Sequence, residues 1–438
     1  MKTPVALSHV LLLAALSYTA QPKAETLPSH ATQDWVGTWG TSPSGPPLPA
    51  ALQTFHNQTL RLIVHTSIGG KRVRIRVSNE RGAVSLRIGE AHLALRQAGA
   101  DIVPGSDRAL TFSAFAAITI PAGAVALSDA VELDVPALSD LAVSLHLPGS
   151  VAASTIHGNT TQTSYVSFGG NFAGAAVLPT ERIIFSWPFL TEVDVQSAGS
   201  ALVTLGDSIT DGAATTRDAN HRWPDFLALR LQAMMDPLVQ RTDRLVSGHR
   251  PVGVVNRGIG GSRQLQDGPA NPMPGIAALA RFDRDVLATA GARHVIVLLG
   301  INDIGVSSSP GTPLDPALGL DELVASYRQL IARAHAKGLA IYGGTMTPFE
   351  GMARPGYYSP DKELVRQAAN QWIRTGGEFD AVIDFDLALR DPSHPSRLLP
   401  AFDSGDHLHP NDLGMQALAN AVPLTLFHTR GFAAPPSK

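Results

Sequence analysis

The stretch ALVTLGDSITDG, residues 201–212, decides the fold of the second half of the chain. A short apolar run, typical of a buried strand, leads here into a tight polar turn. Two more apolar runs, at 252–255 and 295–299, also lead into turns that carry polar residues or glycine. In open α/β sheets, ligands bind beyond the carboxyl ends of the strands. We therefore expect these turns to meet at one site.

The same rhythm of strand, loop and helix continues to the end of the chain. Further strands are predicted at 339–343 and 381–385, and a last helix at about 411–426. Apolar residues at helical spacing predict two other helices. They are Leu227, Leu231 and Met234 in one, and Leu323, Val324, Tyr327, Leu330, Ile331 and Ala334 in the other. Five apolar strands alternating with helices predict a three-layer α/β sandwich around a five-stranded parallel sheet. The loops 305–319 and 348–360 are candidate substrate walls.

Residues 35–195 have a different period. Short strands with alternating apolar residues, separated by Gly, Pro, Asp and Ser, predict an antiparallel β-sandwich of jelly-roll type. The segments 59–65 and 73–77 are predicted to be two strands around a turn, with their arginines facing solvent. The apolar stretch 183–195 lacks the composition of a flexible linker, so we expect it to be buried between the two halves. The predicted domains are residues 35–195 and 198–430.

Composition limits the class of protein. A length of 438 residues favours two domains, and the content of 44% hydrophobic and 16% charged residues excludes a disordered chain. The net charge of -3 gives no electrostatic signature for nucleic acid or an anionic membrane. The chain has no cysteine, which excludes disulfides, thiolate metal sites and cysteine nucleophiles.

Residues 1–24 are predicted to be a signal peptide. Lys2 precedes the apolar run 10–16, and small residues follow near 19–24. The run is much shorter than the roughly 20 residues that a membrane span requires. We expect export to the periplasm or the medium, without membrane insertion.

Ser208 is a candidate nucleophile because it stands at the turn after a strand. A serine hydroxyl needs a neighbouring base that is itself held by a third group. Asp406 and His409 are three residues apart, so they can meet on one face of a helical turn and direct the histidine toward Ser208. His407 is the competing base. The structural alternatives are that Ser208 caps a helix and that Asp406 caps the helix beginning near residue 410.

The glycine-rich turn 256–261 and Asn302 are candidate binders of negative charge. The turn lacks a full Gly-x-Gly-x-x-Gly pattern, so a dinucleotide site is disfavoured. Glycines that let the backbone offer an N–H to an oxyanion explain the pattern better. Asn302 follows a predicted strand and can donate its side-chain amide, although Asn-Asp is also common in polar turns.

The segments 206–209, 256–261, 300–303 and 406–409 together resemble the four sequence motifs of the SGNH hydrolases, also called the GDSL esterase/lipase family. The motifs occur in the family's order, and the resemblance covers residues 198–430. The resemblance implies a flavodoxin-like fold with Ser208, Asp406 and His409 as the catalytic triad. It also implies an oxyanion hole formed by Ser208, Gly261 and Asn302, with Gly261 preferred to Gly258 and Gly260 because of its distance from Asn256. Ile209 replaces the leucine of the name-giving motif. No metal or organic cofactor is implied.

The whole chain resembles a secreted bacterial subgroup of this family with an N-terminal β-domain, described as arylesterases or acylhydrolases. The resemblance implies a serine esterase that acts through an acyl-serine, with small acyl groups on carbohydrate as the favoured substrate. Small-molecule or polysaccharide esters are thus the expected partners, and aryl or short-chain lipid esters are the alternative. Two rivals are an inactive carbohydrate-binding protein and a metal-dependent phosphoesterase.

Overall fold

The computed structural model describes Met1 and residues 34–45, 47–235, 250–268, 275–308 and 318–427. The predicted signal peptide, apart from Met1, lies outside these residues. The described residues from Asp34 onward belong to one compact unit. Within the described ranges, no helix is both long enough and apolar enough to cross a membrane.

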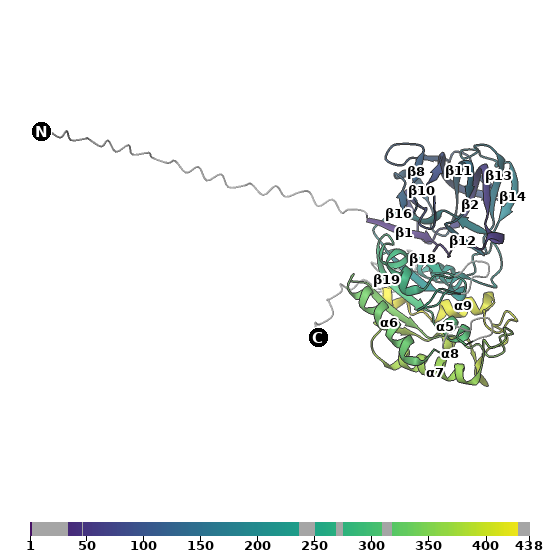
Figure 1. Ribbon diagram of the computed structural model, residues 1–438, viewed down its shortest axis with the longest axis vertical. Helices are drawn as coiled ribbons and strands as arrows, with labels where there is room; N and C mark the ends of the chain where they lie inside the picture. The colour runs from purple at the N-terminus through teal and green to yellow at the C-terminus, as the bar shows by residue number, and fades with distance from the viewer. Residues whose placement is uncertain (2–33, 46, 236–249, 269–274, 309–317, 428–438) are drawn as a thin grey trace. The chain divides into compact units, whose positions relative to one another are not determined.

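The first half is an antiparallel β-sandwich, as predicted (Figure 1). In the described part of this half, one sheet has the strand order β1-β16-β3-β10, with β9 beside β3, and the other has the order β14-β13-β2-β11-β5-β6, with β7 beside β5. Two short pairs, β12 with β15 and β4 with β8, complete it. The strands are β1 (Asp34–Gly40), β2 (Thr54–His65), β3 (Gly70–Ser78), β4 (Leu86–Ile88), β5 (Glu90–Ala98), β6 (Asp101–Ile102), β7 (Arg108–Leu110), β8 (Ile118–Ile120), β9 (Val125–Leu127), β10 (Val131–Val135), β11 (Asp140–Ala152), β12 (Ile156–Gly158), β13 (Ser164–Gly169), β14 (Thr180–Ile184), β15 (Ser186–Pro188) and β16 (Leu190–Ser197).

The two strands predicted around the turn near residue 69 exist, but they do not pair with each other. β2 lies in one sheet and β3 in the other, so the connection crosses the sandwich. The solvent-facing arginines were also predicted wrongly. Arg61 is fully buried and donates to Ser144 and to backbone carbonyls, while Arg74 and Arg76 pair with acidic residues of β16. Alternation along a strand shows which residues share a face, but not what covers that face.

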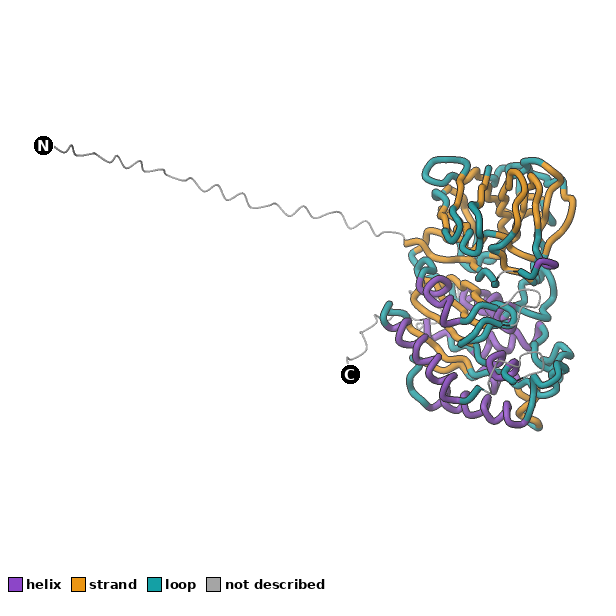
Figure 2. The backbone as a smooth tube through the Cα atoms, viewed as in Figure 1, coloured by secondary structure: helices purple, strands orange, loops and turns teal. Residues whose placement is uncertain are grey.

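The second half is the predicted three-layer α/β sandwich, with helices on both faces of the sheet (Figure 2). The described strands form one parallel sheet in the order β18-β17-β19-β20-β21. Alternate residues of β19 enter different cores: Val295 and Val297 pack with α6, and Ile296 and Leu298 with α2 and α9. The strands are β17 (Ser200–Gly206), β18 (Val252–Gly258), β19 (Ala292–Leu298), β20 (Ala340–Gly344), β21 (Ala381–Ile383) and the small pair β22 (Arg390–Asp391) and β23 (His394–Leu398). The helices are α1 (Ser208–Asp211), α2 (Trp223–Ala233), α4 (Ala278–Phe282), α5 (Ile301–Val306), α6 (Leu320–His335), α7 (Pro360–Thr375), α8 (Phe385–Leu389) and α9 (Asp412–Ala421).

The last helix is shorter than predicted. α9 ends at Ala421, and a 3-10 turn, Leu424–Phe427, follows Pro423. Val422 has extended backbone angles, because a residue before proline is disfavoured in the helical region. The proline therefore divides the predicted segment into two pieces.

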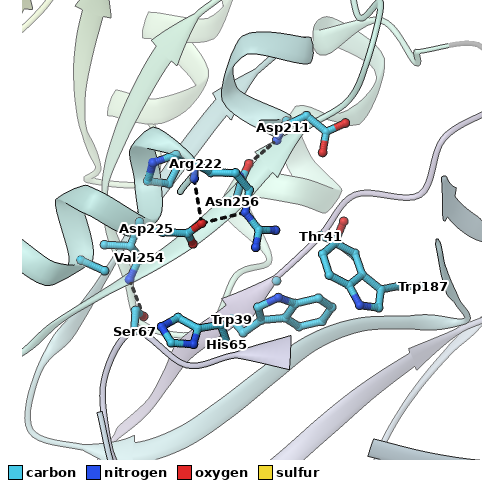
Figure 3. A pocket seen from close by; sticks show the side chains of 14 residues that line it. Trp39, Thr41, His65, Ser67, Trp187, Asp211, Arg222, Asp225, Val254 and Asn256 are labelled. Atoms are coloured by element: carbon cyan, nitrogen blue, oxygen red, sulfur yellow. Dashed lines mark hydrogen bonds and ion pairs between the residues drawn. The ribbon is translucent and has the colours of Figure 1, made fainter. Parts of the chain in front are cut away.

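Polar groups of the sandwich join the two halves. Glu192 of β16 is buried, pairs with Arg257 of β18 and accepts the Ala290 N–H at 3.0 Å. Ser67 Oγ accepts the Val254 N–H at 2.8 Å, beside a cavity between the halves (Figure 3). Most apolar residues of 183–195 lie in the sandwich core, namely Ile184, Trp187, Phe189, Leu190, Val193 and Val195. This core also contains Ala201 of β17 and Val255 of β18, and Trp187 lines the cavity between the halves, so the predicted place between the halves holds for part of the stretch.

Candidate active site

Ser208 is the first residue of α1, directly beyond the carboxyl end of β17. Asp207, not Ser208, caps this helix, because its carboxylate accepts the Ile209 N–H at 3.0 Å. Burial raises the pKa of Asp207 to about 6, although the Ile209 N–H and the nearby His409 and Arg281 oppose this shift. The Ser208 side chain has no part in capping and is available for chemistry.

His409 and Asp406 continue from Ser208 in a single row of hydrogen bonds. His409 Nε2 lies 2.8 Å from Ser208 Oγ, and His409 Nδ1 lies 2.5 Å from Asp406 Oδ2. If the Asp406 carboxylate accepts the Nδ1 proton, the unprotonated Nε2 faces the serine hydroxyl. This tautomer can remove the Ser208 proton.

The Asp406–His409 contact forms in a turn rather than in the predicted helical turn. Asp406 Oδ1 accepts the backbone N–H groups of Leu408 at 2.9 Å and His409 at 2.8 Å. Partial burial raises the pKa of Asp406, but the His409 side chain and these N–H groups outweigh it and hold the pKa well below its usual range. Asn411, not Asp406, caps α9. Asp406 is thus an ionised acceptor with a fixed orientation.

His407 lies apart from the nucleophile. Its Nδ1 is 2.5 Å from Asp403 Oδ2, and its side chain is 52% exposed. His407 has a backbone φ of 63°, in the left-handed region, so its side chain leaves the backbone in a different direction from those of Asp406 and Leu408. Of the two candidate bases, the structure brings only His409 to Ser208.

The glycine-rich turn lies beside α1. Ile259 N–H donates to Gly206 O at 3.2 Å, and Ser262 N–H closes a tight turn on Ile259 O at 3.0 Å. Gly261 occupies the third position of this turn with φ 71°, which a type II turn requires and glycine tolerates. Within the described residues, the N–H groups of Ser208 and Gly261 have no hydrogen-bond partner.

Asn302, the second residue of α5, contacts the same turn. Its Nδ2 donates to Ser262 O at 3.2 Å, and its Oδ1 lies 2.9 Å from the Tyr357 hydroxyl. A backbone carbonyl can only accept, so the atom facing Ser262 is the nitrogen, and Tyr357 must therefore donate to the amide oxygen. Among the described residues, no acceptor takes the second proton of the Asn302 amide, which leaves it for a ligand.

Three supporting residues were not identified from the sequence. Tyr357, in the loop predicted as a substrate wall, is buried and holds the Asn302 amide. Asp303 accepts the Gln264 N–H, and burial raises the pKa of Asp303 to about 7. Arg281 donates to Gly206 O at 2.8 Å and Ser262 Oγ at 3.2 Å. The predicted wall 348–360 contains Tyr357 and Asp303 adjoins the predicted donor Asn302, whereas no sequence pattern pointed to Arg281.

A hydroxyl, an imidazole and a carboxylate in one row at the strand ends of a parallel α/β sheet define the class of serine hydrolases. Residues 204–417 match the family model of the GDSL-like lipases and acylhydrolases. The chain thus carries a domain of the GDSL-like lipase/acylhydrolase family and is a carboxylic ester hydrolase.

Solved structures similar to this chain include a GDSL-like lipase from Bacteroides thetaiotaomicron, with 18% identity and a TM-score of 0.36, covering 51% of this chain and 85% of that chain. A variant of an acetyl xylan esterase from Geobacillus stearothermophilus is also similar, with 22% identity and a TM-score of 0.36, covering 51% of this chain and 93% of that chain. No curated protein matches the chain.

Proposed function

We propose that this protein is a secreted serine esterase that removes small acyl groups, acetyl above all, from carbohydrate through an acyl-serine. The observation that carries the reaction type is the continuous row from Ser208 Oγ through His409 to Asp406. The unpartnered N–H groups of Ser208 and Gly261 and the Asn302 amide lie on segments that contact one another beside this row. They are the donors that a developing oxyanion needs.

In the first step, Ser208 Oγ attacks the ester carbonyl carbon while His409 Nε2 takes the hydroxyl proton. The carbonyl oxygen becomes negative and accepts hydrogen bonds from the Ser208 and Gly261 N–H groups and the Asn302 amide. Asp406 stabilises the imidazolium that forms. When the tetrahedral intermediate collapses, the alcohol leaves with the proton of His409, and the acyl group stays on Ser208.

In the second step, His409 takes a proton from water, and the resulting hydroxide attacks the acyl-serine carbonyl. The same three donors stabilise the second oxyanion. Collapse breaks the bond to Ser208 Oγ, which regains its proton from His409. The products are a carboxylic acid and the free enzyme.

The substrate and the location rest on the sequence. The resemblance to secreted proteins with an N-terminal β-domain supports an acylated carbohydrate. The predicted signal at residues 1–24 supports export, and an exported esterase meets polysaccharide outside the cytoplasm. Aryl and short-chain lipid esters are the alternatives within the same chemistry.

A substrate panel tests this proposal. Acid release is measured from acetylated xylan, acetylated monosaccharides, aryl acetates and longer acyl esters, with wild type and Ser208→Ala side by side. We expect the highest kcat/KM on acetylated carbohydrate and no turnover by the variant. Preference for long acyl or aryl esters would overturn the substrate class, and equal turnover by the variant would overturn the mechanism. Stoichiometric metal in the pure protein, measured by inductively coupled plasma analysis, would favour the metal-dependent phosphoesterase.

A further inference from the structure

A second histidine contacts α1, and it comes from the β-sandwich. His157 lies in β12 and is 1% exposed. Its Nδ1 is 2.7 Å from Ser42 O, and its Nε2 is 2.9 Å from Asp211 Oδ1 at the end of α1. A residue of the sandwich thus reaches the helix that carries the nucleophile.

The partners of His157 fix its protonation. A backbone carbonyl and a carboxylate both accept hydrogen bonds, so both ring nitrogens must carry protons. Burial lowers the pKa of His157 and nearby Arg222 does the same, but the attraction and hydrogen bonds of Asp211 outweigh them and raise it. The result is a buried imidazolium paired with the Asp211 carboxylate. Such a histidine cannot serve as a base.

The second oxygen of Asp211 holds the glycine turn. Asp211 Oδ2 accepts the Gly260 N–H at 3.1 Å. Gly260 is exposed and precedes Gly261, whose N–H is a proposed oxyanion donor. Asp211 therefore connects the sandwich, the nucleophile helix and the oxyanion turn through one carboxylate.

We propose that Asp211 and His157 are positioning residues: the sandwich histidine orients the Asp211 carboxylate, which in turn holds the Gly260–Gly261 turn where its N–H meets the oxyanion. This inference rests on the proposed acyl-transfer mechanism and deepens it. It makes the β-sandwich a part of the catalytic apparatus. His157 is buried and Asp211 acts through the glycine turn, so the role assigned to both is positioning.

Two substitutions at Asp211 test whether its hydrogen bonds position the glycine turn. In Asp211→Asn, the amide oxygen can still accept the Gly260 N–H while the amide nitrogen donates to a neutral His157, so we expect kcat on an aryl acetate within about threefold of wild type. In Asp211→Ala both contacts are lost. We expect kcat to fall about 10- to 100-fold with little change in KM, which approaches the loss of an oxyanion donor.

Asp218→Ala is the matched control. Asp218 follows α1 and also binds the sandwich, through Thr163 N at 2.6 Å and Gln162 Nε2 at 2.8 Å, but in the described part of the chain it makes no hydrogen bond to the glycine turn. We expect its kcat to stay near that of wild type. A loss equal to that of Asp211→Ala would mean that any contact between the halves matters, which would overturn the inference.

A double-substitution cycle provides a readout that a purely structural role would not give. If Asp211 acts through the oxyanion hole, the loss in Asp211→Ala with Asn302→Ala should be smaller than the product of the two single losses. Losses that multiply fully would overturn the inference, as would unchanged kcat in Asp211→Ala. If either result were found but the wild type hydrolysed esters and an organophosphonate modified its Ser208, the proposed function would still hold. A wild type without esterase activity would contradict both the proposed function and this inference.

Discussion

Two histidines contact opposite ends of α1, and the groups that face their rings give them different chemistry. His409 has Asp406 on Nδ1 and the Ser208 hydroxyl on Nε2, with a side chain that is 17% exposed. His157 has a carbonyl on Nδ1 and Asp211 on Nε2, and is buried. Only the first ring can present a lone pair to a donor. A histidine paired with an aspartate can therefore act as a base only when its second ring nitrogen is unprotonated and faces a hydrogen-bond donor.

The largest expected effect comes from removing that base. His409→Ala should lower kcat by about 10⁴- to 10⁶-fold, because Ser208 then has no proton acceptor. His407→Ala should retain most activity, since its ring faces Asp403. Initial rates on an aryl acetate measure both. Equal losses in the two variants would contradict the assignment of the base.

Removal of the side-chain oxyanion donor should have the next largest effect. Asn302→Ala should lower kcat about 10²- to 10³-fold with little effect on KM, because the hydrogen bond from the Asn302 amide to the carbonyl oxygen strengthens as negative charge develops on that oxygen. Steady-state kinetics separate the two constants. A raised KM with unchanged kcat would make Asn302 a substrate contact instead.

A smaller effect is expected when the support of that donor is removed. Tyr357→Phe loses the hydroxyl that orients the Asn302 amide, and kcat should fall about tenfold or less. Tyr342→Phe is the control, because this buried tyrosine donates to Leu426 O at 3.1 Å and lies 2.9 Å from His294 Nδ1, away from the oxyanion donors. Tyr357→Phe should lose about 1 kcal/mol of unfolding free energy for its buried hydrogen bond, and Tyr342→Phe at least as much, because its hydroxyl takes part in two. Equal kcat values in the two variants would contradict the role of Tyr357 in orienting the Asn302 amide.

The smallest expected effects concern the free energy of unfolding. The contributions of the His157–Asp211 and His409–Asp406 pairs to this free energy should change with pH in opposite directions. The raised pKa of His157 means that its contribution is fully present below about pH 6.5 and is lost as pH rises through the folded-state value. The lowered pKa of Asp406 means that its contribution is present above about pH 4 and is lost as pH falls.

Denaturant unfolding of wild type, His157→Gln and Asp406→Asn across pH 3–9 tests this. The stability difference between wild type and His157→Gln should shrink with rising pH, and the difference for Asp406→Asn should shrink with falling pH. The same direction for both would contradict the charge states assigned to the pairs.

The sequence predicted the α/β half well because each buried strand leads directly into a polar turn. The spacing of Asp406 and His409 sufficed to bring them together, although the local structure is an Asx-type turn rather than a helix. The contact between His157 and Asp211, 54 residues apart, left no local pattern. The crossing of β2 and β3 between sheets was equally hidden, because a hairpin and a crossing connection share the same alternation.

Covalent labelling of Ser208 tests the central claim most directly. An organophosphonate ester is added to wild type and to His409→Ala, and mass spectrometry locates the modified residue and follows its rate. The account predicts rapid modification of Ser208 in wild type and very slow modification in the variant, because His409 must take the hydroxyl proton. Modification of another serine, or equal rates in the two proteins, would contradict it.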